Sequence, residues 1–487
     1  MDNYILGFGP FVVTTDLDRA ERNVEGRSVA LKKELGLRDL VLTQIVFVVG
    51  TAWVGTAAKL GDSHVSFWLL AILLFYIPQA AVVIYLNRLM PLEGGLYQWA
   101  KFGFNDFAGF MVAWNLWLLA FTVMALCGLV VTTNLSYSIG ASAGWMQESK
   151  WVVPIVSCVL TVSLVAVSIR GLSLGKWVHN AGGIIMLVTY GALVALPFIS
   201  LARGELKEYH PLKIVAPTFS MFNLNIFSKM VLGALSGFEY VAILGGECRS
   251  PARNIGRSVI VAAPFIALMF ILGTSSVLAF TGGEHVDLIG PVPQTLSIGF
   301  RSFPIVGAIV SIAILLLAMR SIALMSIYLA GSSRLPMVAG WDRLLPAWFT
   351  KLHPRYKTPV NSIIFVGAIT LCFSLASLIG TGAQEAFQLV DNAASVFYGI
   401  VYVVMFAIPL VGAKNIIKNA PAWLRVASAC GFIVSLAAIW FTIFPIIGVR
   451  SRFAFAAKII AVALIGNAIG AAIFAIRSRR AALADPT

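Results

Sequence analysis

The chain has 487 residues, of which 59% are hydrophobic and 11% are charged, and its mean hydropathy is +0.90. A soluble protein carries roughly 25% charged residues, so this composition excludes an ordinary soluble domain. The formal net charge of +14 would suit nucleic acid if the basic residues formed one cluster. They are spread along the chain instead, and no nucleic-acid partner is expected.

Apolar segments of about 20 residues or more, long enough to cross a bilayer, recur from Asp39 to Arg477. We predict an all-α polytopic membrane protein with twelve spans, in which the long stretch 106–139 counts as one tilted span. The membrane domain covers residues 37–477, with short tails at 1–36 and 478–487. The spans are expected near residues 39–60, 65–90, 106–139, 151–170, 173–200, 222–247, 257–281, 303–331, 360–380, 384–412, 424–447 and 454–476.

Basic residues gather on one side of these spans. With a cytoplasmic N-terminus, 24 of the 35 lysines and arginines fall in cytoplasmic segments, nine in outer loops and two, Lys229 and Arg320, inside spans. This asymmetry follows the positive-inside rule and predicts a multi-pass protein of the cell membrane, inner or plasma, with both termini cytoplasmic. The first 36 residues lack the apolar core of a cleavable signal peptide, so the first span is expected to act as the targeting signal.

The five cysteines and five histidines are scattered along the chain. No disulfide framework and no metal site is predicted from such spacing. The cytoplasmic segments contain no nucleophile–base pair and no Walker-type phosphate loop, which argues against an enzyme and against an ATP-driven pump. No cofactor is expected.

Two predicted spans are interrupted near their centres by small residues. The first interruption reads Gly50-Thr51-Ala52-Trp53 and the second Gly233-Ala234-Leu235-Ser236-Gly237-Phe238-Glu239. Lipid offers no partner to freed backbone groups, so such breaks are tolerated where they line a cavity inside the protein. Breaks at corresponding positions of two halves are typical of inverted-repeat transporters. The halves would be residues 37–200 and 222–412, followed by two peripheral spans at 424–477.

The breaks themselves are candidate binding elements. Unpaired N–H groups at Gly50, Thr51 and Ala52 suit a substrate carboxylate, because a helix N-terminus carries partial positive charge. Freed carbonyls around Ser236 and Gly237 suit an ammonium group or a cation. For a single glycine, close helix packing would be the simpler explanation, but two glycines in matched halves favour binding.

Ionisable residues inside spans are rare and usually functional or paired. Glu239 could bridge the two breaks, sense protons or meet a substrate amine. Arg320, followed by Ser321 in the eighth span, needs a partner or acts as a fixed internal cation, and Asp391 in the tenth span is a candidate partner or a second carboxylate on the path. Lys229 lies nearer the outer end of its span and ranks lower.

Aromatic residues near the breaks are further candidates for substrate binding. Phe238 could cover the substrate or simply pack, and Trp53, which directly follows the first break, is a candidate substrate-binding residue. Trp114 in the third span is a weaker substrate-binding candidate, because tryptophans at helical spacing are more often core or lipid-facing.

Two loops are long enough to act in gating. The basic loop 334–359 is predicted to form a short interfacial helix with Trp341 and Trp348 at the headgroups, or alternatively a gate. The outer loop 282–302, with Glu284 and Asp287, could fold over a vestibule.

Several segments resemble the amino acid–polyamine–organocation (APC) transporters, in the order that the family has them. Residues 91–97, Pro-Leu-Glu-Gly-Gly-Leu-Tyr, are similar to its P-x-x-G-G-x-Y segment. Residues 237–257 are similar to its sixth span and the following loop, and residues 334–361 to the loop between its eighth and ninth spans. Leu35-Gly36-Leu37 sets a register in which Gly50-Thr51-Ala52 falls on the family's Gly-Ser-Gly break. The resemblance covers roughly Leu31 to Lys414.

The resemblance implies a five-plus-five inverted-repeat fold with discontinuous first and sixth helices, and transport of amino acids, polyamines or related amines by symport or exchange. The chain departs from the family at four positions. Ala52 and Val46 stand where the family has glycines, and Gly233 stands where many relatives carry a bulky aromatic gate. Met186 stands near the position of a fifth-span lysine found in many proton-coupled relatives, so the coupling ion, H+ or Na+, is left open.

The leading hypothesis is therefore a secondary active amino acid transporter that works by alternating access. A transporter of polyamines or other organic cations is the alternative, with Glu239 and Asp391 as holders of two ammonium groups. A substrate sensor that does not transport is less favoured, because both tails are short. Arg320 is the hypothetical replacement for the missing fifth-span lysine. The oligomeric state is left open.

Overall fold

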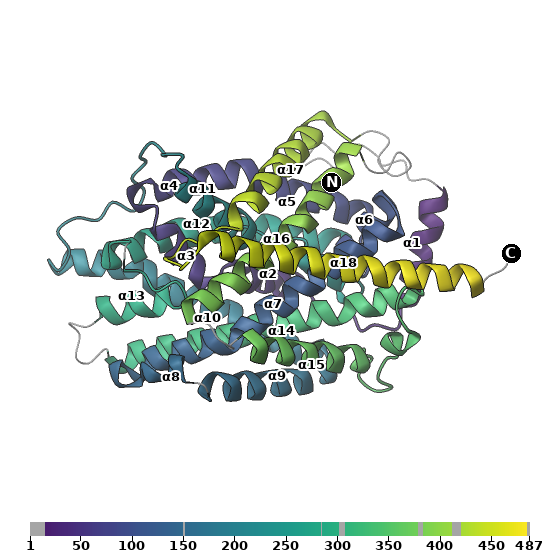
Figure 1. Ribbon diagram of the computed structural model, residues 1–487, viewed down its shortest axis with the longest axis horizontal. Coiled ribbons are helices and arrows are strands. Elements are labelled where there is room, and N and C mark those ends of the chain that lie inside the picture. Colours follow the sequence, from purple (N-terminus) through teal and green to yellow (C-terminus); the bar gives the residue numbers. More distant parts are fainter. Residues whose placement is uncertain are drawn as a thin grey trace.

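The computed structural model describes residues 15–149, 151–283, 285–300, 307–377, 383–411 and 420–484. These parts are helical almost throughout, since a helix satisfies its own backbone groups in lipid. The helices run lengthwise in Figure 1, with α1 and α6 toward one end, called here the α1 end, and α13 toward the other, the α13 end.

The α-helices are α1 (Thr15–Ser28), α2 (Leu37–Val48), α3 (Thr51–Ala58), α4 (His64–Ala71), α5 (Ile77–Leu89), α6 (Leu96–Gly103), α7 (Asp106–Ile139), α8 (Trp145–Glu148), α9 (Val152–Arg170), α10 (Leu172–Ala202), α11 (Met221–Lys229), α12 (Pro251–Thr281), α13 (Pro291–Gly299), α14 (Gly307–Trp341), α15 (Val360–Ser377), α16 (Ala383–Val411), α17 (Ala422–Thr442) and α18 (Arg452–Ala484). The short 3₁₀ and π elements are η1 (Gly61–Ser63), η2 (Ile72–Tyr76), η3 (Ala141–Ala143), η4 (Met230–Ala234), η5 (Tyr240–Glu247) and η6 (Ala347–Thr350).

Nine helices in the described parts are long and apolar enough to cross a membrane, or ten if the bent pair α2 and α3 is one span. The shorter apolar helix α15 and the interrupted stretch from α11 to η5 lie at the two remaining predicted positions. The protein is thus a multi-pass membrane protein, and the total of twelve spans stays a prediction.

The core of the bundle is α7, and its periphery is α18. In the most apolar 18-residue stretch of each helix, 83% of the residues of α7 are buried inside the protein, compared with 28% of those of α17 and 11% of those of α18. α7 packs mainly against α14 and α16, while α18 lies along the outside of the bundle (Figure 1). The helices after residue 420 are therefore peripheral to the ten-span unit, and much of their surface is left for lipid.

Both predicted breaks are present in the backbone. α2 ends at Val48, the chain passes through extended Val49 and Gly50, and α3 begins at Thr51 with its axis turned by 42°. The second break separates the π-helix η4 from the 3₁₀ helix η5, and Gly237 between them has a φ of 131°. Each break frees backbone groups inside the bundle.

Two loops differ from the sequence-based expectation. The segment from Arg334 to Trp341 is not a separate interfacial helix but the buried continuation of α14. Pro336 removes the N–H that would bond Ser332 O in a helix, and the indole Nε1 of Trp117 donates to that carbonyl instead, at 3.0 Å. The outer loop contains the buried helix α13, and its residues 284, 301 and 302 lie outside the described residues.

Replacement of Gly237 by alanine should destabilise the second break. A Cβ there would lie 2.6 Å from Cδ1 of Phe47, and the φ of 131° disfavours any L side chain. We expect a cost of roughly 1–3 kcal/mol, seen as a lower melting temperature of the purified protein in detergent. Gly191→Ala is the matched control, because no described atom lies within 4 Å of its Cβ position. Equal melting temperatures for the two variants would contradict the account of the break.

Candidate functional site

A cavity of about 130 Å³ lies between the two breaks. It is enclosed by residues of α2, α3, α7, η4, α14 and α16. The predicted site residues that line it are Gly50, Thr51, Ala52, Trp53, Ser236, Arg320, Ser321 and Asp391. The fold thus brings together residues that are more than 300 positions apart in the sequence.

Four predicted site residues are not part of the cavity lining. Gly237 shapes the backbone of the second break, and Phe238 is buried against Tyr76 with ring centroids 4.8 Å apart. Trp114 faces α18, where its Nε1 donates to the carbonyl of Gly466 at 2.8 Å. Glu239 does not line the cavity itself, but it accepts a hydrogen bond from Tyr398, which does.

Glu239 connects the second break to two other helices. Its carboxylate accepts hydrogen bonds from Tyr398 and, at 2.7 Å, from Tyr402 of α16, and from Gln79 of α5 at 3.2 Å. Tyr402 also accepts the backbone N–H of Gly237 at 2.7 Å. These bonds link the second break to α16 and α5 rather than to the first break, and one of the partners, Tyr398, lines the cavity.

Arg320 contacts the first break directly. Its Nη2 donates to the carbonyl of Val46 at 2.8 Å and to that of Val49, the groups that the end of α2 leaves free. Among the described residues no carboxylate lies within ion-pair distance of Arg320, and its Nε has no hydrogen-bond partner. The guanidinium therefore sits where a bound cation would be held by the same carbonyls.

Asp391 lines the cavity on α16 and has a lysine nearby. Lys229 of α11 is fully buried, and its Nζ donates to Oδ1 of Asn392, the residue that follows Asp391. The position of Lys229 in the sequence suggested that its side chain extends outward, but the side chain is buried inside the protein and bonded to α16.

The polar ends of the breaks face the cavity. No side chain of the described residues caps the N-terminus of α3, so the N–H groups that follow Gly50 are open to a ligand acceptor. The part of the remaining wall that comes from α7 and α14 is largely apolar. Its members are Leu119, Val123, Met124, Leu126, Cys127, Val130, Leu324 and Met325.

Sequence reasoning missed the aromatic floor of the cavity. Phe47 stacks on Tyr240 with ring centroids 4.3 Å apart and lies 4.7 Å from Tyr328, and the hydroxyl of Tyr240 donates to Tyr328 O at 3.0 Å. Phe47 and Tyr328 line the cavity at its α1 side. Phe47 could have been predicted from the sequence, because it lies three residues before Gly50. Tyr240 and Tyr328 could be recognised only once the fold was known.

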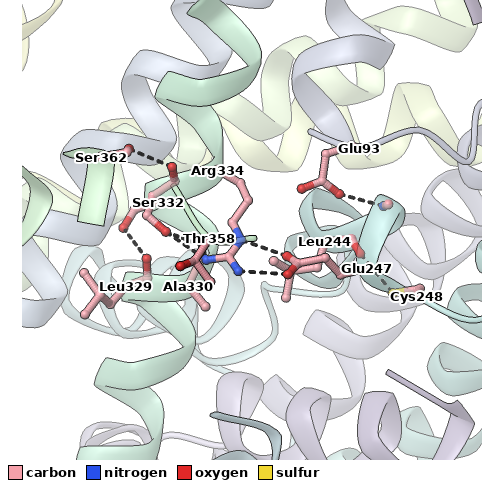
Figure 2. A network of polar contacts seen from close by, with 12 residues as sticks. Glu93, Leu244, Glu247, Cys248, Leu329, Ala330, Ser332, Arg334, Thr358 and Ser362 are labelled. Carbon is pink, nitrogen blue, oxygen red and sulfur yellow. Dashed lines mark hydrogen bonds and ion pairs between the residues drawn. The ribbon is translucent and has the colours of Figure 1, made fainter. Parts of the chain in front are cut away.

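A buried ion pair, shown in Figure 2, links two elements at the α1 end. Arg334 of α14 donates to Glu247 of η5 through Nε at 2.8 Å and Nη2 at 3.0 Å, and both side chains are buried. Nearer the surface, Asp342 at the end of α14 pairs with Lys101 of α6 at 2.7 Å and with Arg27 of α1 at 3.6 Å. These contacts join α1, α6, η5 and α14 across this end.

A second carboxyl group belongs to the same network. Glu93, in the connection from α5 to α6, accepts the backbone N–H of Gly246 at 2.6 Å and is 1% exposed (Figure 2). Burial, together with the negative charge of Glu247, raises the pKa of Glu93 to about 8. Near neutral pH this carboxyl therefore holds a proton.

The described residues contain no cluster of histidine, cysteine and carboxylate side chains that could bind a metal.

Comparisons with known proteins agree with this architecture. A family model described as amino acid permease matches residues 37–469, so the chain belongs to the amino acid permease family. It is similar to an uncharacterized transporter of Legionella pneumophila, 25% identical over 390 residues, which cover 77% of this chain and 80% of the relative.

Two further relatives have named substrates. The branched-chain amino acid permease BcaP of Bacillus subtilis is 23% identical over 395 residues, 75% of this chain and 80% of BcaP. A protein of Lactococcus lactis named probable agmatine/putrescine antiporter AguD is 22% identical over 244 residues, 49% of this chain and 50% of AguD.

Among solved structures, MhsT in complex with L-phenylalanine matches with a TM-score of 0.60 at 15% identity. The match covers 83% of this chain and 97% of MhsT. It identifies the fold as the five-plus-five inverted repeat with discontinuous first and sixth helices.

Glu247→Gln should open the α1 end. The change leaves the buried guanidinium of Arg334 without a charged partner, at a cost of roughly 3–5 kcal/mol. Cys248 is buried beside this pair and serves as a reporter when the other four cysteines are serine. We expect a thiol reagent to label Cys248 at least tenfold faster in the variant, since 1.4 kcal/mol is a factor of about ten. The same change at exposed Glu208 is the control, and unchanged labelling would contradict a closing role for the pair.

Glu93→Gln should flatten the pH dependence of stability. A carboxyl group whose pKa is raised binds its proton more tightly in the folded state, so folded stability falls as the pH rises from about 4.5 toward 8. Melting temperatures of the wild type should therefore drop between pH 5 and pH 8, and those of the variant should drop less. Parallel curves for the two proteins would show that Glu93 is not the titrating group.

Proposed function

We propose that the protein is a secondary active transporter that moves amino acids across the cell membrane by alternating access. The observation that carries the proposal is the cavity between the two breaks, with the uncapped N-terminus of α3 as one wall. In this proposal both termini are cytoplasmic, so that the α1 end with its Arg334–Glu247 pair is the cytoplasmic gate.

The substrate carboxylate binds at the first break. The N–H groups of Thr51 and Ala52 and the dipole of α3 favour a negative group at this point. The substrate ammonium binds at the opposite break, where η4 ends at Ala234 and its last carbonyls lack a following helical turn. Ser236 lines the cavity at the same place, although its hydroxyl already donates to Leu232 O at 2.6 Å.

The cavity favours an amino acid with an apolar side chain over a polyamine. Its walls on α7 and α14 are mostly aliphatic, which suits an apolar side chain. Among the described residues, Arg320 and Asp391 are the charged ones that line the cavity, and buried Lys229, bonded to Asn392 of the same helix α16 as Asp391, adds a further positive charge behind this wall. A polyamine has no carboxylate for the first break and is repelled by both cations.

Arg320 takes the place of a coupling ion in this mechanism. Its guanidinium bonds the freed carbonyls of Val46 and Val49, so that position does not need Na+. Because the guanidinium stays charged, it does not carry a proton either. We therefore propose exchange of one amino acid for another rather than ion-driven symport.

The function is tested with purified protein in proteoliposomes and a panel of radiolabelled amino acids and polyamines. Uptake of an apolar amino acid should rise when the liposomes contain unlabelled substrate, and should not require Na+ or a pH gradient. Saturable binding without flux would indicate a sensor instead. Preferred uptake of putrescine would favour the polyamine alternative and overturn the assignment of the first break to a carboxylate.

Arg320→Ala should abolish exchange, because it leaves two carbonyls at the first break unpaired inside the membrane at a cost of several kcal/mol. Arg320→Lys should retain part of the activity, since one ammonium can reach one or both carbonyls. Exchange rates at saturating substrate measure the effect, with surface Arg203→Ala as the control. Full, unaltered transport by Arg320→Ala would contradict the proposed role.

A further inference from the structure

The indole of Trp53 fills the space between the two breaks. A Cβ placed on Gly50 would lie 2.4 Å from Cδ1 of Trp53 and 2.5 Å from Nε1. A Cβ placed on Gly233 would lie 2.3 Å from Cη2 of the same ring. The five-membered ring of Trp53 therefore lies against Gly50 and its six-membered ring against Gly233, so the ring bridges α3 and η4.

The indole is also part of the cavity wall. Trp53, Gly50 and Gly233 all line the cavity. α3 leads away from the first break and packs against α13, while η4 leads toward the second break from the same side. The ring thus lies on the α13 side of the cavity, opposite the floor that Phe47 and Tyr328 form on the α1 side.

We propose that Trp53 is the aromatic cover of the substrate cavity and that it determines the size of the side chain that the cavity accepts. Gly50 and Gly233 form its seat, because a side chain at either position would occupy the volume of the ring. The inference rests on the proposed transport function and assigns to it a specificity-determining residue. A substrate that enters between α3 and η4 displaces the indole, and the returning ring packs on the bound side chain.

The contact of the ring with Gly233 allows an experiment that distinguishes a specificity-determining tryptophan from a merely structural one. Gly233→Ala places a methyl group inside the ring volume, so the indole must leave its position. In a Trp53→Ala background the three ring atoms nearest to this methyl group are absent, so its main clash is removed. The two substitutions are therefore expected to be strongly non-additive, which a double-mutant cycle measures.

Exchange kinetics in proteoliposomes provide the readout, with the best apolar amino acid from the wild-type panel. Trp53→Ala should raise KM about tenfold or more while changing kcat less, since loss of an aromatic contact on a bound ligand is worth roughly a factor of ten. Trp53→Phe should recover most of the affinity. Trp53→Ala should also narrow the preference between small and large apolar substrates.

The double variant Trp53→Ala/Gly233→Ala should have the KM of Trp53→Ala alone, whereas Gly233→Ala alone should impair transport. Trp177→Ala, at an exposed tryptophan of α10, and Gly191→Ala are the controls and should behave as wild type. Additive effects, or an unchanged KM and unchanged selectivity in Trp53→Ala, would overturn the inference while leaving the transport function standing. A wild-type protein that moves no amino acid would overturn the transport function itself.

Discussion

The structure depends on how it satisfies the backbone groups that two broken helices release inside a membrane. At the first break, Arg320 of α14 donates to the carbonyls of Val46 and Val49, and Tyr190 of α10 donates to Gly50 O at 3.4 Å. At the second, Tyr402 of α16 accepts the N–H of Gly237. Without these partners the breaks would cost several kcal/mol each in lipid.

The same partners hold the surrounding helices around the cavity. The groups that hold the breaks come from α10, α14 and α16, and α14 and α16 also line the cavity, so both breaks are bonded to helices of the cavity wall. Glu239 extends this linkage to α5 through Gln79. The cavity is bounded by a floor of aromatic rings, backed by the Arg334–Glu247 pair, on the α1 side and by the indole of Trp53 on the α13 side. In the proposed alternating-access mechanism these two boundaries open in turn.

The long spans could be predicted because their apolar runs end at strong local signals. The predicted span 106–139 coincides with α7, which begins after Asn105, whose side chain accepts the N–H of Ala108, and ends before Gly140. Both breaks were predictable from their glycines. The continuation of α14 past Pro336 was not, because it depends on the indole of Trp117 from another helix.

The directions in which the side chains of the candidate site point could not be predicted from the sequence. Glu239 and Phe238 belong to the second break but point away from the cavity, toward α16 and Tyr76. The carbonyl partners of Arg320 lie about 270 residues away in the sequence, so a carboxylate was the natural expectation. From the sequence, Gly233 could only be recognised as a position that lacks the aromatic residue of many relatives. The structure adds that the ring of Trp53 lies against it.

The central claim is that the first break binds the carboxylate of an amino acid, and a structure of the protein with a bound apolar amino acid tests it most directly. We predict that the carboxylate lies within 3.2 Å of the N–H groups of Thr51 or Ala52, with the side chain among the α7 and α14 residues of the cavity. A ligand whose carboxylate lies away from the N-terminus of α3, or that binds outside this cavity, would contradict the account.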